Sequence, residues 1–234
     1  MKGILAAFKF LAGGGRFRQD QRSTELSAAL YFPLVGLVIG LGLVLLNRFL
    51  EPRLESELLA VVLIAIMILA TQAVHLDGTL KTFAALAPET AAGGADRPVG
   101  IYGMLAVLLI VLLKIRAVEV IGETRGLSLL LTPVLARWSL VVFLYGAAPA
   151  VDESVAGVVL NVKGWHLLIT TIATLALAGY LLGRPALWIS LSLSLLALLS
   201  RSYLRWRCGG YRYDHLGALI ELSEALSFVF FASL

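Results

Sequence analysis

The chain has 234 residues, of which 59% are hydrophobic and only 15% are charged. A soluble domain carries about 25% charged residues, so this composition excludes an ordinary soluble protein and indicates an integral membrane protein. The formal net charge is +4, but the basic residues are not gathered into one basic and aromatic stretch, which argues against nucleic-acid binding.

The N-terminal segment, residues 1–23, is expected at the cytoplasmic face of the membrane. Residues 1–13 are weakly apolar and lead into three glycines and Arg16, which is not the pattern of a cleavable signal peptide. We predict an amphipathic helix that lies in the membrane interface.

Seven apolar segments follow. Because a bilayer requires roughly 20 apolar residues per spanning helix, the sequence predicts a single all-α domain over residues 1–234. This domain is a polytopic transmembrane helical bundle with about six to seven spanning helices. The predicted spans lie near residues 26–50, 58–76, 99–115, 127–148, 165–182, 185–203 and 216–234.

The positions of lysine and arginine predict the orientation of the bundle. With a cytoplasmic N-terminus, twelve of these residues lie on the cytoplasmic side and five lie outside, while Lys114 and Arg137 fall within spans. Cytoplasmic loops are enriched in basic residues. We therefore expect a multi-pass protein of the inner membrane with cytoplasmic polar loops at 77–98 and 201–215.

The first polar cluster, His75-Leu76-Asp77-Gly78, follows the long apolar segment 57–73. One interpretation is a simple helix end capped by the glycine. The functional interpretation makes Asp77 a metal ligand or general base at the mouth of a membrane helix. His75 cannot share a helical face with Asp77, and we expect it to be an interfacial packing residue.

The second cluster contains Asp96, Pro98, Gly100 and Gly103, just before another apolar segment. Asp96 suits a helix N-cap, and the two glycines lie on the same helical face as Asp96. The glycines are then either a small-residue packing face or a place where a phosphate docks on a helix N-terminus. In the second case Asp96 holds a cation beside the phosphate.

The third cluster places Asp214, Gly217, Glu221 and Glu224 at offsets of 0, 3, 7 and 10, on one helical face. Acidic residues within a membrane segment are costly and usually functional. Arg137 lies in the middle of another span and needs a buried partner, which this acidic face is able to supply. Either a structural ion pair or a substrate contact explains the arginine.

Lys114 shares the angular position of Asp96 but lies about 27 Å further along a helix, at 1.5 Å per residue. We therefore expect Lys114 to extend to the far membrane surface and exclude it from the site.

Taken together, these motifs resemble the cobalamin synthase family, the adenosylcobinamide-GDP ribazoletransferases, over nearly the whole chain. The resemblance rests on their order and spacing: Tyr31-Phe32-Pro33-Leu34-Val35-Gly36, His75-Leu76-Asp77-Gly78, Asp96 with Gly100 and Gly103, Leu113-Lys114, Ala136-Arg137-Trp138, Gly209-Gly210, and Asp214 with Leu216-Gly217-Ala218 and Glu221.

The resemblance implies a membrane transferase of late cobalamin (vitamin B12) biosynthesis. Such an enzyme joins adenosylcobinamide-GDP to α-ribazole or its 5′-phosphate, releases GMP and requires Mg²⁺. It implies catalytic roles for Asp77, Asp96, Asp214 and Glu221, with Asp77 and Asp96 as metal ligands. The residues expected to bind substrate are Gly78, Lys81, Arg97, Gly100, Gly103, Arg137 and Gly217.

The chain departs from the family in its acidic motif. Where the family has a second and a third aspartate after Asp77, this chain has Lys81 and Ala84, and the closing glycine is Ala85. Three interpretations follow: an active but divergent enzyme, a non-catalytic relative that binds a corrinoid, a nucleotide or a pathway partner, and an enzyme with another phosphate-linked substrate. The missing acids also leave open a contribution from another subunit, either a second copy or a pathway enzyme.

Overall fold

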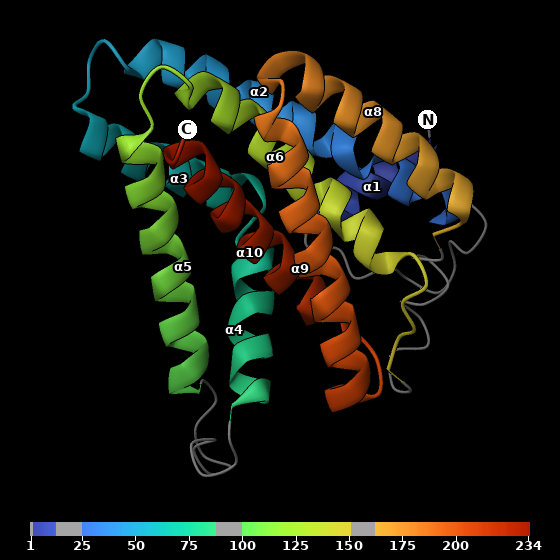
Figure 1. Cartoon of the computed structure of the whole chain (residues 1–234). Helices are drawn as coiled ribbons and strands as arrows, with labels where there is room; N and C mark the ends of the chain where they lie inside the picture. Colours follow the sequence, from blue (N-terminus) through green and yellow to red (C-terminus); the bar gives the residue numbers. More distant parts are fainter. Residues whose placement is uncertain (1, 13–24, 88–99, 151–161) are drawn as a thin grey trace.

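The computed structural model describes residues 2–12, 25–87, 100–150 and 162–234 (Figure 1). These residues form helices and no strand, which confirms the all-α prediction. The helices are α1 (Lys2–Ala12), the 3-10 helix η2 (Glu25–Tyr31), α2 (Phe32–Leu50), α3 (Ser56–Ala70), α4 (Val74–Leu86), α5 (Ile101–Val120), α6 (Arg125–Leu144), α8 (Gly164–Leu182), α9 (Pro185–Cys208) and α10 (Tyr213–Ala232).

Within the described ranges, six helices are long and apolar enough to span a membrane, and α3 with α4 would make a seventh as one bent pair. This agrees with the prediction of about six to seven spans. The six segments are Ala28–Leu50, Ile101–Val120, Arg125–Leu144, Gly164–Leu182, Pro185–Cys208 and Tyr213–Ala232.

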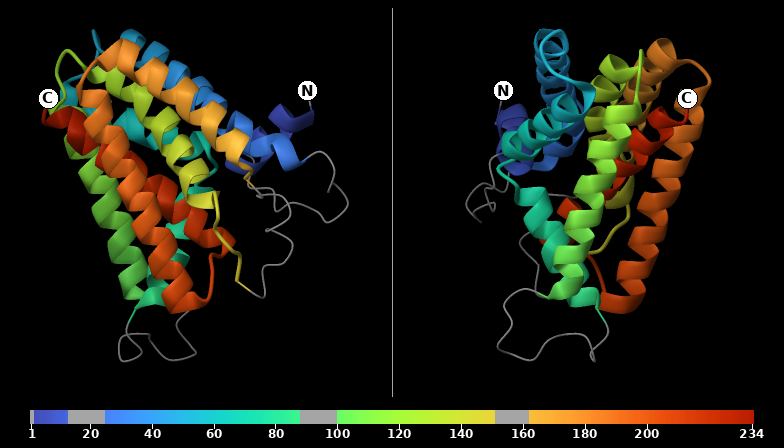
Figure 2. Two further views of the ribbon diagram at one scale, coloured as in Figure 1. Left: turned by 45° about the vertical axis from the view of Figure 1, so that its right-hand side comes forward. Right: turned by 90° about the vertical axis from the view of Figure 1, so that its left-hand side faces the viewer.

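Helices α6 and α10 form the interior of the bundle. In their most apolar stretches 83% and 72% of the residues are buried, against 22–33% in α2, α5, α8 and α9. The outer helices carry many exposed large apolar side chains, such as Leu45, Leu108 and Leu195. Figures 1 and 2 show α5, α4 and α9 descending steeply, while Figure 1 shows α2 and α8 running obliquely from the top of the bundle down to the right. An apolar exterior around a packed interior suits a lipid environment.

The predicted span 58–76 is broken, because α3 and α4 meet at an angle of 87°. Gln72 and Ala73 adopt left-handed backbone conformations with φ of 52° and 57°, which no α-helix can continue through. The hydroxyl of Thr71 donates to the carbonyl of Ile68 and closes the end of α3. As a result His75, Asp77 and Gly78 lie in the first turns of a new helix, so Gly78 does not cap a helix end.

Both predicted polar loops are shorter than expected. Asp77 to Leu86 belong to α4, where Lys81 pairs with Asp77 one turn away, and residues 88–98 lie outside the described residues. Helix α9 continues to Cys208 and ends where Gly209 takes a φ of +70°, a conformation that glycine adopts at low cost. Since α10 begins at Tyr213, only residues 209–212 connect the two helices.

Polar contacts join the ends of the helices on two opposite sides of the bundle. On one side Arg201 donates to the carbonyl of Tyr145, and the hydroxyl of Tyr213 lies 3.5 Å from the carbonyl oxygen of Phe10 in α1. On the other side Arg125 donates to Ser56 at 2.6 Å. The predicted N-terminal helix is present as α1, and the contact between Tyr213 and Phe10 places it beside the start of α10.

Candidate active site at the crossing of helices α4 and α10

Helices α4 and α10 approach each other closely because a glycine on each lies at the contact. A methyl group added to Gly78 would lie 2.6 Å from the carbonyl oxygen of Asp214, and one added to Gly217 would lie 3.0 Å from Cα of His75. No larger residue fits this geometry without moving a backbone. Gly78 and Gly217, both predicted to bind substrate, thus bring the two acidic helix starts together.

A pocket opens at this crossing between α1, α4 and α10. His75, Gly78, Asp214 and Gly217 line it, with Phe10 of α1 among the apolar residues. The predicted site residue Gly78 therefore shares one pocket with Asp214 and Gly217, which lie far from it in the sequence. Asp77 immediately precedes Gly78 but is exposed, and its carboxylate accepts a hydrogen bond from Lys81 at 2.5 Å.

His75 is a candidate site residue that the sequence analysis assigned to packing. It is only 4% exposed, it lines the pocket, and its Nε2 atom has no hydrogen-bond partner among the described residues. A buried ring nitrogen normally has a partner, so a water or a bound polar group is expected at this position. Its place in the His75-Leu76-Asp77-Gly78 motif was the signal that pointed to it.

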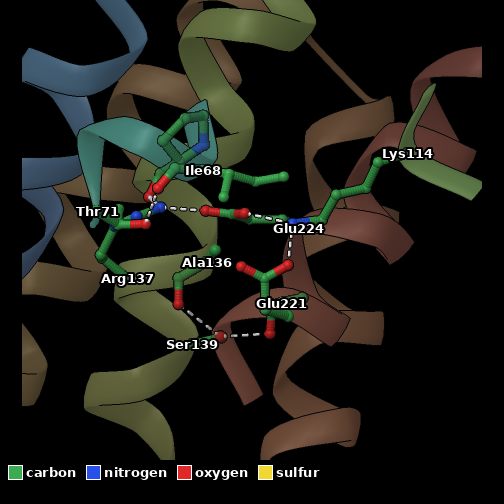
Figure 3. Close-up of polar contacts among 10 residues, drawn as sticks. Ile68, Thr71, Lys114, Ala136, Arg137, Ser139, Glu221 and Glu224 are labelled. Carbon is green, nitrogen blue, oxygen red and sulfur yellow. Dashed lines mark hydrogen bonds and ion pairs between the residues drawn. The ribbon is translucent and has the colours of Figure 1, made fainter. Parts of the chain in front are cut away.

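Deeper in the bundle, four charged side chains form a buried ion cluster: Lys114, Arg137, Glu221 and Glu224 (Figure 3). Lys114 donates to Glu221 at 2.7 Å and to Glu224 at 2.6 Å, and Arg137 donates to the other oxygen of Glu224. Each side chain is at most 4% exposed. Two cations and two carboxylates balance, which offsets the cost of burying the charges.

The prediction that Lys114 extends to the far membrane surface was wrong. The prediction that the acidic face of α10 supplies the partner of Arg137 was right. Helix α5 continues to Val120, so Lys114 lies about 9 Å before its end, at 1.5 Å per residue. Because α5 packs on α10, Lys114 contacts the two glutamates and does not extend to the surface. Arg137 pairs with Glu224, as the first of its two interpretations, a structural ion pair, predicts.

Glu221 was expected among the catalytic acids. In the structure its carboxylate accepts from Lys114 within the buried ion cluster, and only 3% of the residue is exposed. Asp214 and Glu221 share one face of α10 but lie at different depths. Asp214 lines the pocket, whereas Glu221 is in the interior of the bundle.

Gly100 and Gly103 lie against α4. Gly103 is in backbone contact with Leu80, and a methyl group on Gly100 would lie 3.2 Å from Cβ of Ala84. This is the geometry of the small-residue packing face. Gly100 occupies the N-cap of α5, the position expected for Asp96, while Asp96 and Arg97 lie outside the described residues.

The described residues contain no group of three or more histidine, cysteine, aspartate or glutamate side chains able to hold a metal. Mg²⁺ is commonly bound by one or two carboxylates, with waters and substrate phosphates completing its octahedral shell. The exposed oxygens of Asp77 fit that kind of site, provided that Lys81 releases them.

Comparisons with known proteins identify the family. The Cobalamin-5-phosphate synthase model matches residues 4–232. The adenosylcobinamide-GDP ribazoletransferase of Geotalea daltonii is 29% identical over 220 residues, which cover 90% of this chain and 87% of the relative. Proteins with the same name from Caldanaerobacter subterraneus and Syntrophobacter fumaroxidans are 31% and 34% identical, over 88% and 84% of this chain and 87% and 82% of their own.

No solved structure matches the chain. The family match over residues 4–232 confirms the resemblance drawn from the motifs, including the prediction of a transferase of late cobalamin synthesis. The chain belongs to the Cobalamin-5-phosphate synthase family.

Proposed function

We propose that this chain joins adenosylcobinamide-GDP to α-ribazole or its 5′-phosphate at the crossing of α4 and α10, with release of GMP. The observation that carries the proposal is the convergence of His75, Gly78 and Asp214 on one pocket, in a family whose relatives are named adenosylcobinamide-GDP ribazoletransferases. The family match favours this activity over a non-catalytic relative.

In the proposed reaction a ribazole hydroxyl attacks the phosphorus nearest the corrinoid. One oxygen–phosphorus bond forms, the bond to the bridging oxygen of the diphosphate breaks, and GMP leaves. Asp214 is a residue of this pocket, and we assign the hydroxyl proton to its carboxylate. His75 lines the same pocket, and its Nε2 atom has no hydrogen-bond partner among the described residues, so we assign it to orienting a polar group of the substrate.

We propose that Asp77 and Asp96 would hold Mg²⁺ beside the diphosphate of the substrate. When bound, the ion would neutralise the diphosphate and stabilise the departing GMP. Lys81, which holds Asp77 in this structure, and Arg97 then contact phosphate oxygens directly. The buried ion cluster lies deeper and holds α5, α6 and α10 in register.

We further propose that the protein lies in the inner membrane with its N-terminus and this pocket facing the cytoplasm. The N-terminal helix α1 packs beside the start of α10, so the two share one side. The excess of basic residues predicted for that side supports the assignment.

The test is turnover by the purified full chain in lipid nanodiscs, supplied with adenosylcobinamide-GDP, α-ribazole 5′-phosphate and Mg²⁺. GMP release and the corrinoid product are measured together. Asp214→Asn should reduce kcat about a hundredfold or more, as expected for loss of a general base. Glu123→Gln, an exposed change on the opposite side of the bundle, should retain wild-type turnover. Equal turnover in the two variants would refute the role of Asp214.

A further inference from the structure

A second pocket lies on the same side of the bundle but on the other face of the α9–α10 connection. It is bounded by the end of α6, the chain that follows it and the last turns of α9, and it encloses about 540 Å³ including its open mouth. Gly210 and Tyr211 line this pocket, whereas Tyr213 and Asp214 line the pocket at the crossing. Residues 209–214 thus separate the two.

The walls of the second pocket are held by backbone contacts. The amide of Ala150 donates to the carbonyl of Tyr211 at 2.9 Å, and the amide of Tyr211 donates to the carbonyl of Ala148 at 3.1 Å. A methyl group on Gly210 would lie 2.7 Å from the backbone nitrogen of Ala150, and Gly146 turns the chain with a φ of +75°. These backbone contacts fix the walls of the pocket.

The charge in this pocket is positive. Arg201 and Arg205 line it one helical turn apart, and none of its described lining residues is acidic. Arg201 donates one N–H group to the carbonyl of Tyr145, which fixes its position and leaves the rest of its guanidinium for another acceptor. The ion pairs of the described residues include neither arginine.

We propose that this arginine pocket is an anion site for a terminal phosphate group, held by Arg201 and Arg205. Guanidinium groups bind phosphate with paired, charge-assisted hydrogen bonds, and two of them on adjacent turns match the several oxygens of one phosphate. The phosphate comes either from a soluble phosphate monoester or from the headgroup of an anionic lipid, because the pocket opens where a membrane helix ends.

The test uses the full chain in phosphatidylcholine nanodiscs. Ribose 5-phosphate serves as the soluble probe, measured by titration calorimetry. Phosphatidic acid, added to the nanodiscs, serves as the lipid probe, with retained lipid counted by native mass spectrometry. Arg205→Gln and the Arg201→Gln/Arg205→Gln double variant are compared with Arg207→Gln. Arg207 is an exposed arginine near the same helix end, and its substitution removes the same charge outside the pocket.

We expect Arg205→Gln to weaken one of the two probes about tenfold or more, as loss of a charged hydrogen bond predicts, while Arg207→Gln leaves it unchanged. Loss of ribose 5-phosphate binding identifies a soluble phosphate monoester, and loss of phosphatidic acid retention identifies a lipid. Arg205→Gln keeps the anchor between Arg201 and Tyr145, so a folding defect does not explain its effect. Equal effects of Arg205→Gln and Arg207→Gln, or no binding of either probe, would overturn the proposal.

Discussion

The carbonyl oxygen of Asp214 lies so close to Gly78 that a methyl group on the glycine would stand 2.6 Å away. This contact joins two polar motifs that are 136 positions apart in the chain, Asp77-Gly78 on α4 and Asp214 on α10. The glycine therefore sets the distance between the two acidic helix starts, and the pocket between them depends on it.

Gly78→Ala should separate α4 from α10. The added methyl group meets backbone and not a movable side chain, so we expect a loss of about 1–3 kcal/mol in unfolding free energy and a large loss of turnover. The measurements are the melting temperature and GMP release in nanodiscs. Gly42→Ala is the matched control, since nothing lies within 4 Å of its added methyl group and alanine favours the helix. Comparable melting and turnover in the two variants would contradict the assigned packing role.

Lys114→Met should destabilise the bundle by about 3–5 kcal/mol, because it leaves Glu221 and Glu224 with one cation fewer in a buried site. Thermal unfolding in detergent measures the effect. Arg116→Gln removes an exposed cation two residues away, paired with Glu119, and should cost less than about 1 kcal/mol. If Lys114→Met unfolds at the temperature of Arg116→Gln, the buried ion cluster is not the stabilising unit described above.

Lys81→Ala should lower the Mg²⁺ concentration that gives half-maximal turnover, because it removes the ammonium group that holds the Asp77 carboxylate. The readout is the Mg²⁺ dependence of GMP release. Lys81→Arg keeps the positive charge and should behave like the wild type. An unchanged Mg²⁺ requirement in Lys81→Ala would argue against Asp77 as a ligand of the ion.

Removal of Mg²⁺ by EDTA should abolish GMP release, and readdition should restore it, because the diphosphate then lacks its counter-charge. Melting of the protein should not change on chelation, since the buried ion cluster balances its own charges. Full turnover in EDTA would remove the metal from the mechanism.

Cys208 provides a direct test of orientation, because it is the single cysteine of the chain and lies at the end of α9. In intact cells a membrane-impermeant maleimide should label it only after permeabilisation. A Cys208→Ser/Glu123→Cys variant should show the opposite behaviour, since Glu123 lies between α5 and α6 at the other side of the bundle. Labelling of Cys208 in intact cells would reverse the proposed topology.

The sequence by itself determined the class of the protein, the approximate spans and the family. Long apolar segments need no tertiary information to be recognised, because the bilayer imposes their length. The ordered motifs around Asp77, Arg137 and Asp214 were sufficient for the family, which the match over residues 4–232 confirms.

Only the tertiary structure decided which polar residues meet. Lys114 was predicted at a surface because its depth was counted from Asp96 along an idealised helix. Only the packing of α5 on α10 shows the two glutamates beside it. The sequence also did not predict the bend at Gln72 and Ala73, because the apolar segment around them has the composition of a single span. Periodicity orders residues along a helix, whereas contacts between helices depend on where glycines let two backbones approach, as they do at Gly78 and Gly217.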